Sequence, residues 1–225
     1  GSHGGRGEGG GTGVSEATQQ PKKKRRWTIT YVIARVLAYI VFHTICPVRI
    51  HHTERFNRAA PFLVIGNHNS WLDPIAMCYR IHGQQLRFLG KKELVKTKIG
   101  KLILDDLGII AVDRHNSDME ALRSCLRVLK DGQSLGIFPE GTRHHEGVMQ
   151  QIESGVAMIA MRSKVPVIPV YFDSKIRPFH LTHMYVGKDI AYDDLLEQGI
   201  NRETCELFLQ RVRDTYAGMV AAPEK

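Results

Sequence analysis

Cysteine is scarce in this sequence, and its spacing excludes the sites that cysteine usually builds. The four cysteines are far apart and include no Cys-x-x-Cys pair; they are Cys46, Cys78, Cys125 and Cys205. Such spacing indicates neither a zinc site nor a disulfide framework. We therefore expect a protein of a reducing, cytoplasmic compartment.

Other signals are missing as well. The adjacent histidine pairs at 51–52 and 144–145 lack the spacing and acidic partner of a known zinc motif, so no metal site is predicted. No Gly-x-Ser-x-Gly surrounds Ser70, which argues against a serine hydrolase with a nucleophile elbow. No small-x-small cleavage site follows the apolar stretch at 27–46, which argues against a signal peptide.

What remains is the composition of one globular domain. With 225 residues, 43% of them hydrophobic, the chain can bury a sizeable core. Residues 1–20 are rich in glycine and lack apolar periodicity, and the initial Gly-Ser-His resembles the remnant of a removed tag. We exclude these residues from the fold prediction.

Positive charge is concentrated near the start of the chain. The net charge is +8, and five positive charges come from the consecutive lysines and arginines at 22–26. Such runs are common in nuclear-localisation and nucleic-acid-binding segments. Because this one directly precedes an apolar segment, we favour an anionic membrane surface as its partner and expect no nucleic acid.

The apolar segment at 27–46 has a polar side. It is long enough to cross a bilayer, but Arg35 in its middle would cost about 2.5 to 3.5 kcal/mol in the hydrocarbon. Polar and amphipathic residues recur at helical spacing and form one stripe, namely Thr28, Tyr31, Arg35, Tyr39 and His43. We expect a helix that lies in one leaflet or re-enters, with this stripe against the rest of the protein or the head groups.

Apolar strand-like runs alternate with helical stretches along the rest of the chain. Strands are predicted at 61–65, 85–89, 108–112, 134–138 and 165–172, the last interrupted by Pro166 and Pro169. Helices are predicted from Pro74, from Lys91 to near 107, from the capping box at 117–120, at 154–161 and at 201–216. This order predicts an α/β fold with a largely parallel or mixed central sheet flanked by helices. In such sheets ligands bind beyond the carboxyl ends of the strands.

The strand at 61–65 leads into a loop that contains His68 and Asp73. In a continuous helix these side chains would point about 140° apart. In a loop, Asp73 can fold back, orient the imidazole and stabilise its charged form while His68 accepts a proton. The nucleophile would then be a substrate hydroxyl. A simpler interpretation is that Asp73 only caps the helix that Pro74 begins.

Two other predicted strands end in arginine-containing loops. Arg114 follows the strand at 108–112, and Glu140 and Arg143 follow the strand at 134–138. The planar guanidinium group suits phosphate, and Glu140 could orient an arginine or an acceptor hydroxyl. The sequence therefore offers one His/Asp pair and several cations at neighbouring strand ends.

Taken in order, four blocks resemble the 1-acyl-sn-glycerol-3-phosphate acyltransferase family of the glycerolipid acyltransferases. The blocks are Asn-His-Asn-Ser-Trp-Leu-Asp-Pro at 67–74, Gly-Ile-Ile-Ala-Val-Asp-Arg at 108–114, Phe-Pro-Glu-Gly-Thr-Arg at 138–143 and Val-Pro-Val-Ile-Pro-Val at 165–170. The resemblance spans residues 53–172, and Lys-Lys-Glu-Leu at 91–94 also agrees with it. Glu153 departs from the pattern, because relatives typically have a lysine there.

The resemblance implies transfer of a fatty acyl group from acyl-CoA or acyl carrier protein to the sn-2 hydroxyl of lysophosphatidic acid, with no cofactor and no metal. It implies that His68 is the general base and that Asp73 orients it. Residues that would hold or shape the site of the acceptor phosphate are Arg114, Arg143, Lys91, Lys92, Glu140, Gly141 and Thr142. Further motif residues are Asn67, Ser70, Pro139, Pro166, Ile168 and Pro169.

Composition and the resemblance together predict how the chain is organised. We expect a basic, disordered tail over 1–26, a membrane-associated helical segment over 27–50 and a catalytic domain over 51–225, located at the cytoplasmic face of the cell membrane. Three alternatives stay open: an acyltransferase for another lysolipid or for glycerol 3-phosphate, a serine-type lipid hydrolase, and a non-catalytic lipid-binding protein.

Overall fold

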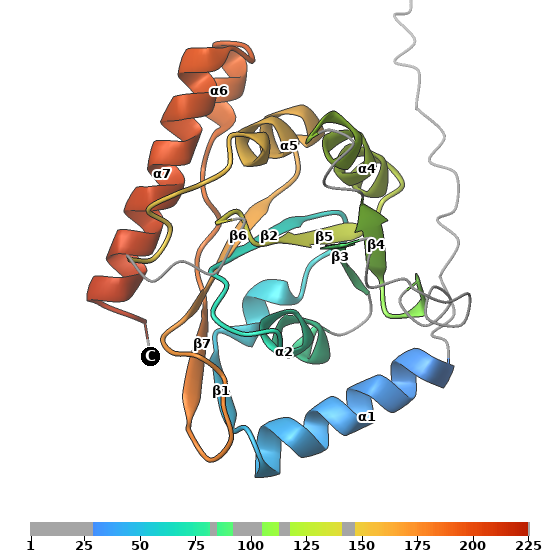
Figure 1. Ribbon diagram of the computed structural model, residues 1–225. Coiled ribbons are helices and arrows are strands. Elements are labelled where there is room, and N and C mark those ends of the chain that lie inside the picture. The colour runs from blue at the N-terminus through green and yellow to red at the C-terminus, as the bar shows by residue number, and fades with distance from the viewer. Residues whose placement is uncertain (1–28, 82–84, 92–104, 113–117, 141–146, 225) are drawn as a thin grey trace, which may run out of the picture.

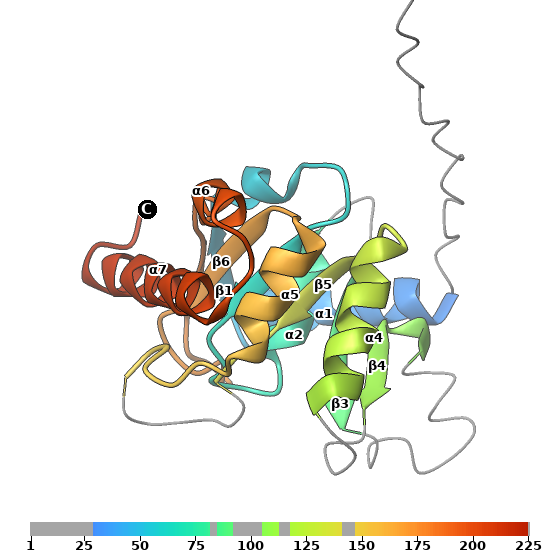
Figure 2. The ribbon, with the colours of Figure 1, turned by 90° about the horizontal axis from the view of Figure 1, so that it is seen from above.

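The protein is described by a computed structural model that covers residues 29–81, 85–91, 105–112, 118–140 and 147–224. A central sheet carries a layer of helices on each face (Figures 1 and 2). The strands are β1 Val48–His51, β2 Leu63–Gly66, β3 Leu86–Lys91, β4 Ile109–Val112, β5 Ser134–Ile137, β6 Val167–Phe172 and β7 Thr182–Val186. The helices are α1 Ile29–Thr44, α2 Asp73–Arg80, α4 Asp118–Lys130, α5 Gly155–Ser163, α6 Asp193–Glu197 and α7 Arg202–Ala221, with a 3-10 turn, η1, at Thr53–Phe56.

The strand order is β1-β7-β6-β2-β5-β3-β4. Strands β6, β2, β5, β3 and β4 run parallel to one another, whereas β7 is antiparallel to β6 and β1 is parallel to β7. The predicted α/β fold with a largely parallel, mixed sheet is confirmed. The carboxyl ends of the five parallel strands therefore meet at one edge of the sheet.

Strand β2 lies at the centre of the core, and its successive side chains face opposite layers. Leu63 and Ile65 pack in the cluster under α4, α5 and α7, whereas Val64 packs in the cluster over α1 and α2. All four residues of β2 are buried. A strand that is buried on both faces has a continuous apolar sequence, which is why residues 61–65 could be predicted as a strand.

Helix α1 packs on α2 with its polar side. The Arg35 guanidinium donates hydrogen bonds to the carbonyl oxygens of Ile81 (2.8 Å) and Tyr79 (2.9 Å) at the end of α2. The other side of α1 is exposed and apolar, and we call these residues the outer face of α1: Ile29, Val32, Ile33, Val36, Leu37, Tyr39 and Ile40. Of the predicted polar stripe, Tyr31 and Arg35 thus face the protein, whereas Tyr39 is on the exposed side. Within the described residues, no helix combines the length and the hydrophobicity needed to cross a membrane.

The structure differs from the sequence-based expectation at several elements. Strands β1 and β7 were not predicted. The domain boundary expected at residue 50 falls inside β1, so residues 48–50 of the expected helical segment belong to the central sheet. Lys91 ends β3 instead of beginning a helix. Strand β6 also continues through Pro169, where an interruption was expected. Proline has no N–H to donate, but the paired residues of β6 and β7 end at Val170 and Val186, so none is needed at Pro169. The Pro169 carbonyl still accepts from Gly187 N just beyond the last pair.

Candidate active site

The loop that follows β2 is held to the end of β6 by Asn67. The buried Asn67 amide donates to Phe172 O (3.0 Å) and accepts from Phe172 N (2.8 Å). These two bonds complete the backbone hydrogen bonding at the end of β6. Asn67 therefore positions the loop, which explains why this motif begins with an asparagine.

His68 and Asp73 are in contact. His68 Nδ1 lies 3.1 Å from Asp73 Oδ2, and the same oxygen accepts from the backbone N–H groups of Asn69 (2.7 Å) and Ser70 (2.6 Å). Asp73 is fully buried, whereas the His68 side chain is 24% exposed. The carboxylate folds back onto its own loop, and no side-chain cap is present at the start of α2. The simpler interpretation of Asp73 as a helix cap is therefore wrong.

The contact with Asp73 sets the tautomer of His68. A carboxylate can only accept a hydrogen bond, so the proton of the neutral imidazole resides on Nδ1. Nε2 then has an available lone pair, and no group in the described part of the chain donates to it. The ring is oriented as a general base requires, with one nitrogen anchored and the other able to accept a proton.

Phe138 supports the imidazole from the neighbouring strand end. The two rings are stacked, with centroids 4.4 Å apart and an angle of 28° between their planes. A Cβ atom on Gly66 would come within 3.1 Å of Phe138, so the glycine at the end of β2 allows this approach. No role was predicted for Phe138 from its sequence pattern, although it begins the Phe-Pro-Glu block.

Glu140 joins the His68 loop to the segment that precedes α5. Glu140 Oε2 accepts from His68 N (3.0 Å), and Oε1 accepts from Met149 N (2.7 Å). Because both oxygens are engaged by backbone amides, the carboxylate acts as a positioning group for His68. This contact was not predicted, since the sequence indicated a partner arginine or hydroxyl for Glu140.

Ser70 is turned away from the imidazole. Its buried hydroxyl donates to Ile176 O (3.4 Å) and accepts from Leu72 N (3.2 Å). No hydrogen bond joins Ser70 to His68 among the described residues. The geometry therefore lacks the nucleophile and base pair of a serine hydrolase.

The remaining motif residues divide into scaffold residues and residues outside the described ranges. Pro166 O accepts from Leu63 N and Pro139 O accepts from Glu153 N, both at 2.9 Å, so these two prolines join neighbouring segments. Ile168 and Pro169 lie in β6 beside Val64 and Ile65 of β2. Lys91 is the last residue of β3, at the same sheet edge as His68. Lys92, Arg114, Gly141, Thr142 and Arg143 lie outside the described residues.

Thiol chemistry is disfavoured at two of the buried cysteines. Burial raises the pKa of Cys78, on α2, to about 12, although the positive charge of Arg35 acts in the opposite direction. Burial likewise raises the pKa of Cys125 to about 12. Both thiols stay protonated near neutral pH and are poor nucleophiles. Within the described ranges, no three His, Cys, Asp or Glu side chains come together as metal ligands.

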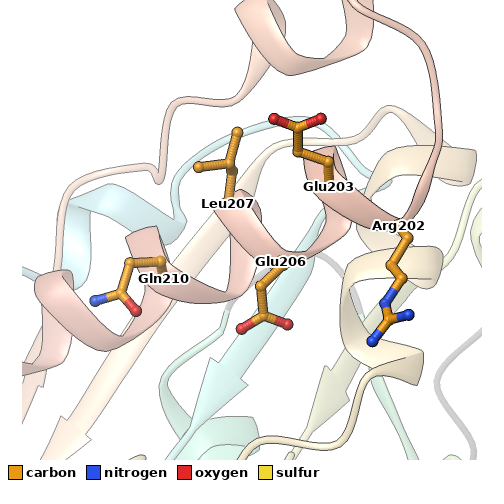
Figure 3. Close-up of a pocket in the computed structure, with 5 residues that line it drawn as sticks. All are labelled: Arg202, Glu203, Glu206, Leu207 and Gln210. Carbon is orange, nitrogen blue, oxygen red and sulfur yellow. The ribbon is translucent and has the colours of Figure 1, made fainter.

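A shallow depression lies elsewhere, on the outer surface of α7 (Figure 3). Its lining residues all come from this one helix: Arg202, Glu203, Glu206, Leu207 and Gln210. They include both charge signs, and none is a predicted site residue. We interpret this depression as the solvated face of α7.

Known proteins with similar sequences carry the family name suggested by the motifs. The 1-acyl-sn-glycerol-3-phosphate acyltransferase of Bacillus subtilis is 30% identical over 125 residues, which are 56% of this chain and 62% of that protein. The Streptococcus pneumoniae protein of the same name is 32% identical over 124 residues, 54% of this chain and 46% of that protein. The chain thus matches about half of the length of these relatives.

A solved structure and a family profile complete the comparison. The 1-acyl-sn-glycerophosphate acyltransferase PlsC from Thermotoga maritima superposes with a TM-score of 0.61 at 20% identity, over 87% of this chain and 79% of that one, which shows a shared fold. The profile of the family described as Acyltransferase matches residues 47–173, more than half of the chain. The matched range contains the His68 loop, Glu140 and all of β6. The chain therefore belongs to the Acyltransferase family.

Proposed function

We propose that this protein transfers a fatty acyl group from the thioester of coenzyme A or acyl carrier protein to the sn-2 hydroxyl of lysophosphatidic acid, giving phosphatidic acid. The observation that carries the proposal is the 3.1 Å contact between His68 Nδ1 and the buried Asp73 carboxylate, at the carboxyl end of a central strand. The names of the relatives support the same reaction. No resident cofactor enters the proposal.

The reaction needs one proton acceptor and no acyl-enzyme. His68 Nε2 removes the proton of the acceptor hydroxyl as its oxygen attacks the thioester carbonyl. The tetrahedral intermediate then collapses, the C–S bond breaks, and the imidazolium returns the proton to the departing thiolate. General base catalysis of this kind contributes about 10²- to 10⁴-fold to the rate. Asp73 stabilises the transient imidazolium because its charge is buried and fixed by the two backbone donors.

The acceptor phosphate would lie along the same sheet edge. We propose that Arg114 and Arg143, with Lys91 or Lys92, bind it, since each follows or ends a parallel strand. Strands β5 and β3 separate β4 from β2, so the end of β4 lies about 14 Å from the His68 loop, three strand spacings away. Replacing Arg143 with alanine should raise the KM for lysophosphatidic acid more than that for the acyl donor. Equal effects on both substrates would contradict this assignment.

The same proposal includes a membrane surface as the source of the acceptor. The outer face of α1 is apolar, and the basic run at 22–26 precedes α1 in the sequence. An amphipathic helix in the interface, with basic residues on anionic lipid, is the arrangement that these features support. We place the protein at the cytoplasmic face of the cell membrane, where acyl thioesters are available.

A product assay tests the proposal. Purified protein is incubated with lysophosphatidic acid and a panel of acyl-CoA and acyl carrier protein thioesters, with and without a chelator, and the lipids are identified by mass spectrometry. We expect phosphatidic acid that contains the donor's acyl chain, and none with His68→Ala. Release of free fatty acid would indicate a hydrolase. Acylation of a different lysolipid or of glycerol 3-phosphate would identify another acceptor, and binding without turnover would indicate a lipid-binding protein.

A further inference from the structure

We propose that the loop between β6 and β7, residues 173–181, is a second membrane contact that acts together with the outer face of α1. We call it the β6–β7 loop. Phe179 is 87% exposed, although phenylalanine is among the residues that are most often buried. The inference rests on the proposed function only in that the acceptor is a membrane lipid.

The backbone holds Phe179 in its exposed position. Its φ of 57° lies in the left-handed region, which bulky side chains rarely adopt. Its N–H donates to Ile45 O (2.7 Å), directly after the end of α1. The exposed ring is therefore presented by a hydrogen-bonded turn that is fixed to the end of α1.

The loop extends the apolar surface of α1. In Figure 1 the β6–β7 loop reaches down to the level of the end of α1, on the side of the molecule where α1 lies below α2. Leu181 and Ile45 are each 44% exposed beside Phe179. Because Ile45 directly follows α1 and its carbonyl is bonded to Phe179, these exposed apolar residues adjoin the end of α1, the helix that carries the outer face. Patches of this kind mark membrane or protein contacts.

The positive charge of this surface favours an anionic lipid bilayer as its partner over a second copy of the chain. Lys175 and Arg177 are exposed on the same loop, and no acidic residue occurs from 29 to 52 or from 174 to 181. Asp173, which begins the loop, accepts from His183 N. In a dimer formed through this surface, positive charges of the two copies would be brought together. Anionic head groups would complement them, at about 1 kcal/mol for each basic residue near the surface, which is about fivefold in affinity.

The β6–β7 loop also contacts the active-site loop. Ile176 O accepts from the hydroxyl of Ser70, and the buried Ile176 side chain packs in the cluster over α1 and α2. Phe172, just before the loop, is bonded to Asn67. A bilayer bound at Phe179 would thus lie at a set distance from His68. We infer that the loop orients the active site towards membrane-borne acceptor.

Vesicle flotation tests the contact. The whole chain is mixed with vesicles of phosphatidylcholine alone or with phosphatidylglycerol, and Phe179→Ser is compared with Leu207→Ser on α7, where the leucine is 44% exposed. We expect Phe179→Ser to weaken binding about tenfold, as expected for a partly inserted ring, and Leu207→Ser to have no effect. Arg177→Glu should weaken binding only to the anionic vesicles and less so at high salt. Phe179→Gly, which removes the ring and suits the left-handed backbone, should repeat the loss without a lower Tm.

The outcomes separate this inference from the proposed function. With a short-chain, water-soluble acceptor, Phe179→Ser should retain wild-type turnover, whereas turnover on vesicle-borne acceptor should fall with binding. Three results would overturn the inference. Phe179→Ser could bind vesicles as well as the wild type, or Leu207→Ser could lose as much binding as Phe179→Ser. The wild type could also be a dimer that Phe179→Ser converts to a monomer. If the chain binds vesicles through Phe179 but makes no phosphatidic acid, the membrane contact stands and the proposed function fails.

Discussion

The two helix layers of the sheet differ in the polarity of their outer surfaces. Helix α7 buries Phe208 and Tyr216 and exposes charged residues, among them Glu203 and Glu206. Helix α1 buries Tyr31, Ala38 and Phe42, but its outer face is apolar. The outer surface of α7 is therefore mostly polar, whereas that of α1 is an exposed apolar patch of the kind that marks membrane or protein contacts. Because α2 and the His68 loop belong to the second layer, the candidate active site shares this layer with the apolar outer face of α1.

Buried polar groups show the same difference. On the α7 side, the Tyr216 hydroxyl donates to Ile65 O (2.6 Å) and accepts from Val170 N (3.3 Å). On the α2 side, Asp73 Oδ1 is buried and has no hydrogen-bond partner within the described residues. A buried carboxylate oxygen without a partner lowers stability and is kept where it serves a function. We therefore expect substitutions of polar groups in the layer of α1 and α2 to change activity, and those in the layer of α7 to change stability.

The largest effect is expected in the active-site loop. His68→Ala should abolish acyl transfer, and Asp73→Asn should lower turnover by orders of magnitude, because the imidazole loses its anionic partner. Product formation measures both variants, and thermal unfolding of His68→Ala should stay close to that of the wild type. The control is Ser70→Ala, which should reduce activity much less. A Ser70→Ala variant as inactive as His68→Ala would bring an acyl-serine mechanism back into consideration.

On the opposite layer, Tyr216→Phe should affect stability alone. Removing the hydroxyl leaves Ile65 O and Val170 N without this partner, which should lower the free energy of unfolding by about 1 to 3 kcal/mol. Turnover per folded molecule should not change. Denaturant titration measures the loss, and Tyr39→Phe on the exposed side of α1 is the matched control. A stable but inactive Tyr216→Phe variant would contradict the division between the layers.

A matched pair of leucines tests the two outer surfaces directly. Leu37 on α1 is 57% exposed and Leu207 on α7 is 44% exposed. Either change to glutamate should alter the free energy of unfolding by no more than about 0.5 kcal/mol, as is usual for surface substitutions. Only Leu37→Glu should release the protein from anionic vesicles, as measured by flotation. Equal retention of both variants would mean that the apolar face of α1 does not contact lipid.

The smallest effect concerns pH. Burial lowers the pKa of His51, and the nearby positive groups His183, His52 and Arg49 act in the same direction, against Asp173. The unfolded chain therefore binds a proton that the folded chain resists, and stability should fall as the pH drops below the ordinary histidine pKa of about 6.5. His51→Phe, which can keep the stacking on Tyr185, should reduce this loss when Tm is followed from about pH 8 to pH 5. An unchanged pH profile would show that His51 does not contribute.

Local sequence determined much of this protein. The apolar run before His68, the five-residue offset to Asp73 and the alternation of strands and helices identified a parallel sheet with a polar loop at a strand end. The charge of Arg35 within an apolar helix indicated that α1 has one polar side, turned to the protein or to head groups, and in the structure Arg35 contacts Tyr79 and Ile81. These features depend on residues that are close in the chain, where spacing and side-chain type determine the conformation.

Tertiary structure decided the rest. Strand β1 pairs with β7, more than a hundred positions later. Its residues Val-Arg-Ile-His alternate between apolar and polar, but a four-residue alternation does not indicate which strand will be its partner. The hydrogen bonds that His68 N donates to Glu140 and that the Asn67 amide makes with Phe172 likewise join distant segments, and they position the loop of the predicted base His68. Phe179 is exposed because a left-handed turn is bonded to the end of α1. Such contacts arise only when the sheet assembles, because no local spacing encodes which strand ends become neighbours.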